Sequence, residues 1–305
     1  MSGKVSIIGG GRVGMSAAFV MLLKNTASEL VLFDRDTERM KGEQLEFQHS
    51  LTFLGTTKIT AAKSYKDLKD SDVIVFTAGR ATLPGESRLN LVKSNLEIIK
   101  TILPEMIKYS PDSVIIMVTN PVDILTYQAN RLLKLSQGRI FGSGTSLDSA
   151  RFRFHLSEFL RINPKSIHTY VLGEHGESSF PTISHADIGG QPLSTMENFS
   201  SKKIQEAFLK TKSAASTIIT AKGATYYAIG VVVNQLVDTV LRDTKRVYPV
   251  SVPLTGQYGY HDVSISVPCV IGKNGVEKIL EIPLSDEEKK QMDKSVKTLK
   301  EIIIS

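Results

Sequence analysis

The chain has 305 residues, 41% of them apolar, which is enough to bury a large core and to form two lobes. Its formal net charge is +6, but the sequence contains no long run of lysine and arginine. It therefore suits small anionic ligands and does not require a nucleic acid, although an ordinary basic surface explains it equally well. We expect no membrane anchor or export signal, because no apolar run approaches a membrane-spanning length and the first strand begins at once. The one cysteine, Cys269, excludes an internal disulfide and fits a core residue in a reducing cytoplasm.

A strand, a glycine-rich turn and a helix are predicted at the N-terminus. The apolar run 5–8 is typical of a buried strand, and residues 13–23 have helical periodicity. Between them, Gly9, Gly11 and Gly14 form the pattern G-x-G-x-x-G, in which glycines allow a tight turn, close approach of a pyrophosphate and close packing of helix on strand. The diphosphate of a dinucleotide is then expected at the helix N-terminus, where free N–H groups favour negative charge.

A second strand ends at Asp34, twenty residues after Gly14. A carboxylate there can accept hydrogen bonds from an adenosine ribose and repels a 2′-phosphate, so the sequence favours NAD over NADP. Arg35 and Arg39 weaken this preference, because arginines can hold the phosphate of NADP. A lone G-x-G-x-x-G also occurs in ordinary glycine turns, but the flanking strands and the correctly spaced aspartate make a nucleotide site the better interpretation.

Residues 1–142 alternate between strands and helices. Further strands are expected at 58–62, 72–78, 113–118 and 139–142. Helices are expected at 37–49, 89–109 and 124–133, with a kink or break at Pro104. Near-continuous apolar strands separated by helices predict an α/β fold with a doubly wound parallel sheet of the Rossmann type. Ligands of such sheets bind beyond the carboxyl ends of the strands, which places 79–88 and 119–123 beside the cofactor.

Residues 143–305 have a different pattern, typical of a second, α+β domain. Helices are expected at 148–160 and over 202–230 and onward to 243, with shorter strands at 169–172, 182–188, 248–252, 264–271 and 276–282. A last helix begins at a capping box formed by Ser285 and Glu288, and its apolar stripe from Met292 to Ile303 is expected in the core. No repeat or flexible linker separates the halves, so we expect the two lobes to pack tightly together.

Four segments carry polar residues in specific patterns. They read G-E-S-R-L-N-L at 85–91, T-N-P-V-D-I-L-T-Y at 119–127, G-S-G-T-S-L-D-S-A-R-F-R at 142–153 and V-L-G-E-H-G at 171–176. Together they resemble the lactate and malate dehydrogenase family over almost the whole chain, and their details are most similar to L-lactate dehydrogenases. The resemblance implies a dinucleotide-binding domain over 1–142, a substrate domain over 143–305, and hydride exchange between NAD and an L-2-hydroxy acid without a metal.

The resemblance assigns the chemistry to three polar side chains. His175 matches the family's proton donor and acceptor, a role that suits imidazole because it titrates near neutrality. Asp148 matches the carboxylate that bonds the second ring nitrogen, and Arg151, three positions later on the same helix, matches the anchor of the substrate carboxylate. Without the resemblance, His175 is a plain loop residue, and Asp148 and Arg151 form an intrahelical pair of the kind common on surfaces.

Three further residues match family positions around substrate and cofactor. Arg88 sits at the end of a loop that begins with residues 79–85 and that the family closes over the substrate. On closure, water is expelled and the Arg88 guanidinium polarises the substrate carbonyl. Asn120 matches a residue that orients His175 and the substrate oxygen, although it can also cap the following helix. Ile229 matches the residue packed on the nicotinamide ring, although burial of its helix explains it as well. The residues expected to line the NAD site are Gly9, Gly11, Arg12, Val13, Gly14, Asp34, Thr77, Ala78, Gly79, Asn95, Val118, Asn120 and Ile229.

The residue that selects the substrate is expected at Thr82. In the family, glutamine at this loop position suits pyruvate, and arginine there pairs with the second carboxylate of oxaloacetate. Thr82 matches neither, and Arg80 either shares its side of an extended loop or faces the cofactor phosphates. Thr225, where malate enzymes usually carry a smaller residue, favours lactate, and a buried dicarboxylate without a paired cation is costly. We therefore expect pyruvate or a somewhat larger monocarboxylic oxo acid, with malate and broad 2-hydroxy acid activity as alternatives.

An anion site is expected at a subunit interface. Arg153 lies two residues after Arg151, about 200° around a helix that turns ~100° per residue, so the two arginines cannot hold one ligand. Arg153 and His168 match positions that, in bacterial lactate dehydrogenases, meet across an interface and bind fructose 1,6-bisphosphate. Unregulated relatives keep the same pair, so a plain interface contact is the alternative. We expect a homotetramer, or else a homodimer.

Two other classes of protein use a similar N-terminal motif. A non-catalytic nucleotide sensor accounts for the first half of the chain and leaves His175, Asp148 and Arg151 unexplained. A related glycosidase family combines such a nucleotide lobe with a metal and a Cys or His ligand set, and the isolated Cys269 argues against it. A hydride-transfer enzyme accounts for both halves of the chain.

Overall fold

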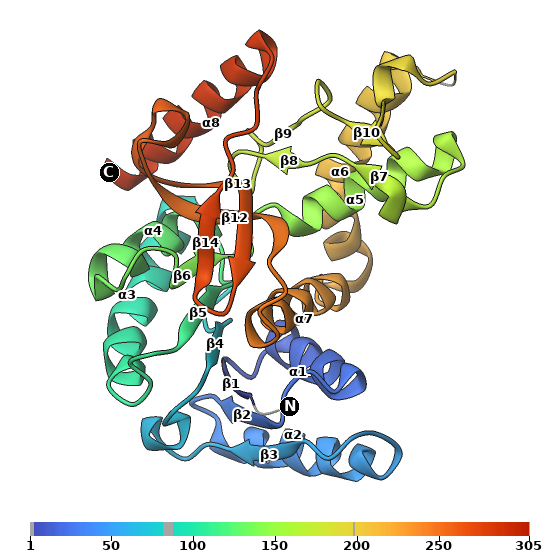
Figure 1. Ribbon diagram of the computed structural model, residues 1–305. Coiled ribbons are helices and arrows are strands. Elements are labelled where there is room, and N and C mark those ends of the chain that lie inside the picture. The colour runs from blue at the N-terminus through green and yellow to red at the C-terminus, as the bar shows by residue number, and fades with distance from the viewer. Residues whose placement is uncertain (1–2, 82–87, 198, 305) are drawn as a thin grey trace.

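The computed structural model describes residues 3–81, 88–197 and 199–304, without the side chains of residues 88 and 304. Within these ranges the chain is built around a nine-stranded sheet, ordered β14-β13-β12-β6-β5-β4-β1-β2-β3 (Figure 1). Its first six strands run parallel and coincide with the expected ones. They are β1 (Lys4–Ile8), β2 (Glu29–Phe33), β3 (Lys58–Ala61), β4 (Val73–Phe76), β5 (Val114–Met117) and β6 (Ile140–Gly142).

Helices cover both faces of the parallel strands, because successive strand residues alternate between two apolar cores. The helices of one face are α1 (Arg12–Lys24), α2 (Thr37–Ser50) and α7 (Tyr227–Leu241), and those of the other are α3 (Arg88–Ile107) and α4 (Val122–Leu133) (Figure 1). In β4, Val73 and Val75 belong to the first core, and Ile74 and Phe76 to the second. The expected doubly wound α/β fold is confirmed.

The strand order reverses between β1 and β4, which are hydrogen-bonded neighbours although β2 and β3 separate them in the chain. Gly9 and Thr77 follow directly on these two strands. The Thr77 hydroxyl lies 3.1 Å from the main-chain oxygen of Ile8 and 3.0 Å from that of Gly9. Ligands of doubly wound sheets bind at such a reversal. The fold therefore places the glycine turn where a dinucleotide is expected.

Three antiparallel strands from the second half of the chain continue the sheet beyond β6. Its strands are β12 (Arg246–Thr255), β13 (His261–Gly272) and β14 (Gly275–Ile279). Ser251 of β12 pairs with Gly142 of β6. A Cβ atom on Gly142 would lie 2.5 Å from Oγ1 of Thr126 and 3.1 Å from Cβ of Ser251, so glycine is needed for this close approach. The tight packing expected of the two halves takes the form of one continuous sheet.

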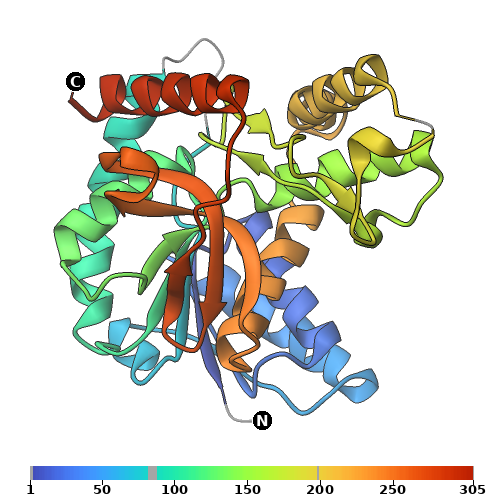
Figure 2. The same ribbon diagram turned by 45° about the horizontal axis from the view of Figure 1, so that its top comes forward.

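The described part of residues 146–222 forms a smaller unit beside the sheet, drawn in yellow-green to gold at the upper right of Figure 2. Its elements are α5 (Ser146–Leu160), α6 (Ser201–Lys222), β7 (Ile167–His168), β8 (Val171–Leu172), β9 (Phe180–Pro181), β10 (Asp187–Ile188) and β11 (Gln191–Pro192). Phe152, Leu156 and Ile204 join a third apolar core here. The strands expected at 169–172 and 182–188 are wrong as continuous elements. A hydrogen-bonded turn, Ala186 N–H to Ile183 O at 3.1 Å, interrupts the second.

Two helix predictions also need correction. The helix expected over 202–230 ends at Lys222, because Gly223 adopts a left-handed conformation with φ of +83° and caps it. A separate helix, α7, begins at Tyr227. Pro104 lies inside α3, which continues to Ile107, so the helix does not break there. Proline so near a helix end removes a single intrahelical donor.

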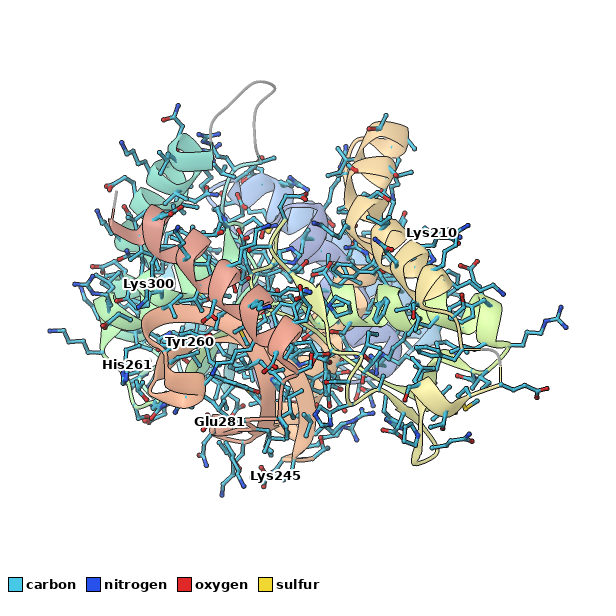
Figure 3. All side chains as sticks on the ribbon, turned by 90° about the horizontal axis from the view of Figure 1, so that it is seen from above. Lys210, Lys245, Tyr260, His261, Glu281 and Lys300 are labelled. Carbon is cyan, nitrogen blue, oxygen red and sulfur yellow. The ribbon has the colours of Figure 1, made fainter. Side chains whose placement is uncertain are left out.

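The last helix, α8 (Asp286–Ile304), begins as expected. The Ser285 N–H donates to Glu288 Oε2 at 2.9 Å, and the Glu288 N–H donates to Ser285 Oγ at 3.3 Å, which confirms the capping box. The hydroxyl of Tyr260, labelled in Figure 3, donates to Asp293 at 2.5 Å and ties the connection between β12 and β13 to this helix. Cys269 is a buried core residue of β13, as expected. Among the described residues, no helix is both long and apolar enough to cross a membrane.

Candidate active site

The glycine turn opens the N-terminus of α1. Gly9 has a φ of +112°, and a Cβ atom there would lie 2.6 Å from the Ala78 nitrogen. A Cβ atom on Gly14 would lie 2.1 Å from the Gly9 oxygen, so helix and turn touch at this point. At Gly11, in contrast, the Cβ position has no atom within 4 Å. The two outer glycines close the turn, and Gly11 leaves the helix end open.

The open helix end has the properties of a diphosphate site. The first main-chain bond into α1 is donated by Met15 to Gly11, at 3.0 Å, so the N–H groups of Arg12, Val13 and Gly14 have no such partner within the helix. No acidic residue lies in the first turn. Free donors and the positive end of the helix dipole together favour an anion. These residues therefore fit the diphosphate of NAD.

Asp34 directly follows β2, close to the place expected for the ribose. Its Oδ2 accepts the Gly10 N–H at 2.7 Å, and its Oδ1 accepts the Asp36 N–H at 3.0 Å. The carboxylate is thus oriented by the glycine turn itself. Each oxygen keeps one lone pair for a ribose hydroxyl.

Other residues expected in the cofactor site surround the carboxyl ends of β4 and β5. Thr77, Ala78 and Gly79 follow β4, and Val118 follows β5. Asn95 of α3 is fully buried, where it accepts the Arg80 N–H at 2.9 Å and donates to the Asn120 oxygen at 2.8 Å. The described contacts of Asn95 therefore fix the two loops that border the site.

His175 and Asp148 meet as the sequence predicts. Asp148 lies in the first turn of α5, and His175 lies in the loop after β8. Nδ1 of His175 is 2.6 Å from Oδ2 of Asp148, and the histidine side chain stays 29% exposed. Burial alone would lower the pKa of His175, but the charge and hydrogen bond of Asp148 outweigh it and raise this pKa to about 8. With Nδ1 engaged, Nε2 is the atom that can exchange a proton with a ligand.

Arg151 lies beside this pair. Its Nη1 is 3.2 Å from Oδ1 of Asp148, and its side chain is 12% exposed. Burial works against the ionised form of Asp148, yet His175 and Arg151 together hold its pKa below the usual value. The intrahelical pair and the site arrangement are both present. Asp148 uses one oxygen for each partner, so Arg151 and His175 face the same region.

The segment after β5 adds one residue from the loop and one from the first turn of α4. Asn120 Oδ1 accepts the Val122 N–H at 3.3 Å, but the N-cap of α4 is Pro121, so Asn120 does not cap the helix itself. Asp123 Oδ2 accepts the main-chain N–H of His175 at 2.7 Å. Asp123 is not among the site residues predicted from the sequence. Its position could have indicated a role, because it is a carboxylate in the first turn of a helix that follows a strand, at the edge of the sheet where ligands bind.

Thr225 and Ile229 lie at the junction of α6 and α7, next to the start of α1. A Cβ atom on Gly230 would lie 3.0 Å from the main chain of Ser16, which shows how closely α7 packs on α1. The Arg12 guanidinium lies 5.8 Å from the centre of the Tyr226 ring. The fold thus brings this junction to the helix end that fits the diphosphate.

Two expected site features fall partly outside the described residues. Thr82 is not described, and neither is the side chain of Arg88, although Arg88 starts α3. Arg80, which precedes this segment, donates from Nη2 to Ser94 Oγ at 2.9 Å. Its guanidinium is therefore held on α3.

The two residues of the expected anion site lie on neighbouring elements, α5 and β7. Burial lowers the pKa of the Arg153 guanidinium below the usual value, and Tyr170 and Tyr248 act on it electrostatically in the opposite direction. His168 is exposed on β7, two residues before Tyr170. Among the described residues, no carboxylate lies within ion-pair distance of Arg153.

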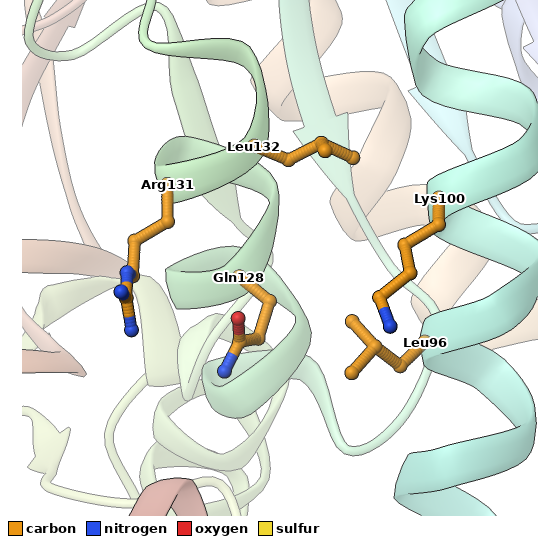
Figure 4. Close-up of a pocket in the computed structure, with 5 residues that line it drawn as sticks. All are labelled: Leu96, Lys100, Gln128, Arg131 and Leu132. Atoms are coloured by element: carbon orange, nitrogen blue, oxygen red, sulfur yellow. The ribbon is translucent and has the colours of Figure 1, made fainter.

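A separate hollow of about 260 Å³ lies between α3 and α4 (Figure 4). Its lining residues are Leu96, Lys100, Gln128, Arg131 and Leu132. Lys100 pairs with Glu97 at 2.9 Å, and Arg131 lies 5.8 Å from the centre of the Tyr127 ring. Both cations already have partners, and this hollow is distinct from the surroundings of His175.

Two family models match the chain. Residues 3–142 match the lactate/malate dehydrogenase NAD binding domain, and residues 145–305 match the lactate/malate dehydrogenase alpha/beta C-terminal domain. The chain is 42% identical to L-lactate dehydrogenase 1 of Clostridium acetobutylicum over 307 residues, covering 99% of this chain and 98% of the relative. It is also 42% identical to L-lactate dehydrogenase 1 of Staphylococcus aureus over 303 residues, covering 98% of this chain and 96% of the relative.

Solved structures agree with these matches. A lactate dehydrogenase from a Medee basin deep-sea metagenome library superposes with a TM-score of 0.95 at 36% identity, covering 99% of this chain and 98% of that one. The minor L-lactate dehydrogenase of Enterococcus mundtii, in a ligand-bound form, gives a TM-score of 0.96 at 35% identity over the same shares. The chain therefore belongs to the lactate/malate dehydrogenase family and is an NAD-dependent oxidoreductase that acts on a CH–OH group.

Proposed function

We propose that this enzyme interconverts pyruvate and L-lactate, or a somewhat larger pair of the same kind, with NADH and NAD. The observation that carries the proposal is the joint placement of His175 and Arg151 around Asp148, with contacts of 2.6 and 3.2 Å. The full-length similarity to proteins named L-lactate dehydrogenase supports the same substrate class.

The chain's own residues divide the work of the reaction. NAD, when bound, supplies or takes up the hydride. Arg151 holds the substrate carboxylate as a planar fork, and His175 gives the carbonyl oxygen a proton from Nε2 during reduction and takes it back during oxidation. Asp148 keeps the ring oriented and favours its protonated form. Arg88 is assigned the polarisation of the carbonyl, and Asn120 the orientation of the substrate oxygen.

A monocarboxylate is favoured over oxaloacetate. Arg80 is the cation nearest in sequence to Thr82, and its guanidinium bonds Ser94 on α3. Drawing it toward a second carboxylate would break that contact. A second carboxylate without a paired cation is expensive to bury. Malate dehydrogenase activity is the second candidate, because Arg80 belongs to the same loop.

Initial-rate measurements of NADH oxidation test this function. We expect a higher kcat/KM with pyruvate or 2-oxobutyrate than with oxaloacetate, and no dependence on added divalent metal or on chelators. NADPH serves as the cofactor control, since Asp34 disfavours the extra phosphate. A preference for oxaloacetate contradicts the lactate assignment, and absence of NADH oxidation by every 2-oxo acid contradicts the function itself.

We further propose a homotetramer in the cytoplasm, with a homodimer as the smaller alternative. Phe19 and Leu23, four residues apart on α1, are exposed together, and Phe53 after α2 is 87% exposed. Arg153 offers a second contact region, because its half-buried guanidinium has no ion-pair partner among the described residues and a phosphate or sugar bisphosphate can neutralise it. The buried single cysteine, Cys269, suits a reducing compartment.

A further inference from the structure

His175 is held at two points by two different carboxylates. Asp148 of α5 bonds the imidazole ring at 2.6 Å, and Asp123 of α4 accepts the main-chain N–H at 2.7 Å. Asp123 is 2% exposed, so its carboxylate is largely shielded from water. The ring contact belongs to the mechanism above. The main-chain contact takes no direct part in the proton transfer.

We propose, on the basis of the function above, that Asp123 is a positioning residue for His175. Its carboxylate fixes the main chain that carries the histidine, and its negative charge favours the imidazolium. Asp123 therefore sets how readily His175 releases a proton, without touching the substrate. It also joins the loop after β5, on the cofactor side, to the loop after β8.

The surroundings of Asp123 support an ionised carboxylate. It lies in the first turn of α4, where the helix dipole stabilises negative charge. Burial raises the pKa of Asp123 to about 6, against the opposing influence of Ser251 and His175. At neutral pH the carboxylate form still predominates. A charge in such a poorly hydrated place acts more strongly on its neighbours than the same charge in water.

Little else neutralises this charge. Oδ1 of Asp123 and the hydroxyl oxygens of Thr126 and Ser251 are buried, and none of the three has a hydrogen-bond partner among the described residues. Ser251 nevertheless lowers the pKa of Asp123, as His175 does, against the larger effect of burial. The His175 N–H is thus the donor that engages Asp123 directly. Its field is available to the imidazole.

Four charged or titratable groups surround the His175 ring within the described residues. Asp148 and Arg151 face it from α5, Asp123 from α4, and Glu174 precedes it in its own loop. The Glu174 carboxylate accepts a hydrogen bond from the Ser178 N–H at 3.3 Å, and the Glu174 N–H donates to Ser295 Oγ at 2.7 Å. Asp123 is therefore the group whose charge can be removed while the contacts of Asp148 and Glu174 stay intact.

Asp123→Asn separates charge from contact, because the amide oxygen can still accept the His175 N–H. We expect the pH limb of kcat/KM for oxo acid reduction, and that for hydroxy acid oxidation, to move to lower pH together by about one unit. Reduction needs imidazolium and oxidation needs neutral imidazole, so a lower histidine pKa shifts both limbs in the same direction. If Asp123 had a purely structural role, the substitution would lower the rates by a constant factor and leave both limbs of the pH profile in place.

Asp123→Ala also removes the acceptor. We expect kcat to fall about tenfold to a hundredfold, as a small misplacement of a reacting group can cost ~10²-fold, with unchanged NADH affinity. Asp72→Asn is the matched control, since Asp72 accepts the Lys4 N–H at 2.8 Å far from the site. Its pH profile should match that of the wild type.

Titration of the His175 ring by NMR, in wild type and Asp123→Asn, gives a reading that needs no turnover. A lower ring pKa in the variant supports the proposal even if the substrate assignment fails. An unchanged ring pKa, or limbs that stay in place while the wild type reduces 2-oxo acids, overturns it and leaves the proposed function standing. Thermal unfolding of each variant separates misfolding from these effects.

Discussion

Nδ1 of His175 lies 2.6 Å from Oδ2 of Asp148, although 27 positions separate the two residues in the chain. The second oxygen of the same carboxylate reaches Nη1 of Arg151 at 3.2 Å. One aspartate in the first turn of α5 thus orients the group that exchanges the proton and the group that holds the substrate. Loss of the His175 ring and loss of the Asp148 charge should therefore disturb the same proton transfer.

Replacing His175 by asparagine should abolish turnover and spare the cofactor. The loss of a general acid lowers the rate by ~10²–10⁴-fold, whereas the diphosphate site at Gly11 is formed by other elements. NADH fluorescence measures binding, which suits a chain without tryptophan. Turnover within about tenfold of wild type contradicts the role given to His175.

Asp148→Asn should move the pH dependence as well as lower the rate. Because the charge of Asp148 overcomes the effect of burial and raises the His175 pKa to about 8, its removal lowers that pKa. In the wild type, kcat/KM for reduction should fall as pH rises through about 8, and that for oxidation should rise. In the variant both changes should occur at lower pH. Steady-state profiles in both directions check this, and unshifted profiles contradict it.

Gly11→Ala and Gly14→Ala should fail in different ways. A Cβ atom on Gly11 meets no atom within 4 Å, so the variant should fold normally but obstruct the open end of α1 and weaken NADH binding. A Cβ atom on Gly14 would lie 2.1 Å from the Gly9 oxygen, so this variant should lose stability, by roughly 1–3 kcal/mol. Thermal unfolding and NADH titration distinguish the two. Gly42→Ala, on the open face of α2, is the control.

Thr82→Arg should shift the substrate preference toward oxaloacetate. The new guanidinium supplies a cation for the second carboxylate, which removes much of the cost of burying it. The ratio of kcat/KM values for oxaloacetate and pyruvate, in wild type and variant, is the measurement. Thr82→Ser controls for the loss of the methyl group. If the wild type already prefers oxaloacetate and Arg80→Ala removes that preference, Arg80 is the missing cation.

Arg153→Gln should weaken the assembly or its response to anions. Burying the Arg153 guanidinium is expensive where no described carboxylate pairs with it, and its lowered pKa reflects the cost of burial. We expect phosphate or fructose 1,6-bisphosphate to stabilise the wild-type oligomer and to have less effect on the variant. Sedimentation velocity with and without the anion tests this. Identical assembly and identical responses rule the anion site out.

The sequence predicts the parallel half of the sheet well, because its strands are short apolar runs separated by amphipathic helices. Local signals also predict the capping box of Ser285 and Glu288, which the structure confirms. They do not predict where the helix over 202–230 ends. Its periodicity continues past Gly223, and only the left-handed conformation of that glycine stops it.

A contact of the site can be predicted where motifs fix both residues, and is missed where only a long-range contact brings a residue to the site. The pairing of His175 with Asp148 follows from the motifs. In the sequence, Asp123 is indistinguishable from an ordinary turn residue. Its role as an acceptor for His175 cannot be predicted locally, because 52 positions of the chain separate the two residues. The continuation of the sheet by β12 is equally non-local. Its pairing with β6 depends on Gly142 meeting Ser251.

The shared sheet limits how such an enzyme can be recombined. A fragment ending at residue 142 would leave β6 as a bare edge and would lose Val233 and Val237 of α7 from the core under α1. In a chimaera joined at this point, β6 from one parent would have to pair with β12 from the other, and α1 would have to pack on the α7 of the other parent. Crossovers that keep β12, β13 and α7 with the first 142 residues should give folded hybrids, whereas a simple exchange of halves should give aggregates.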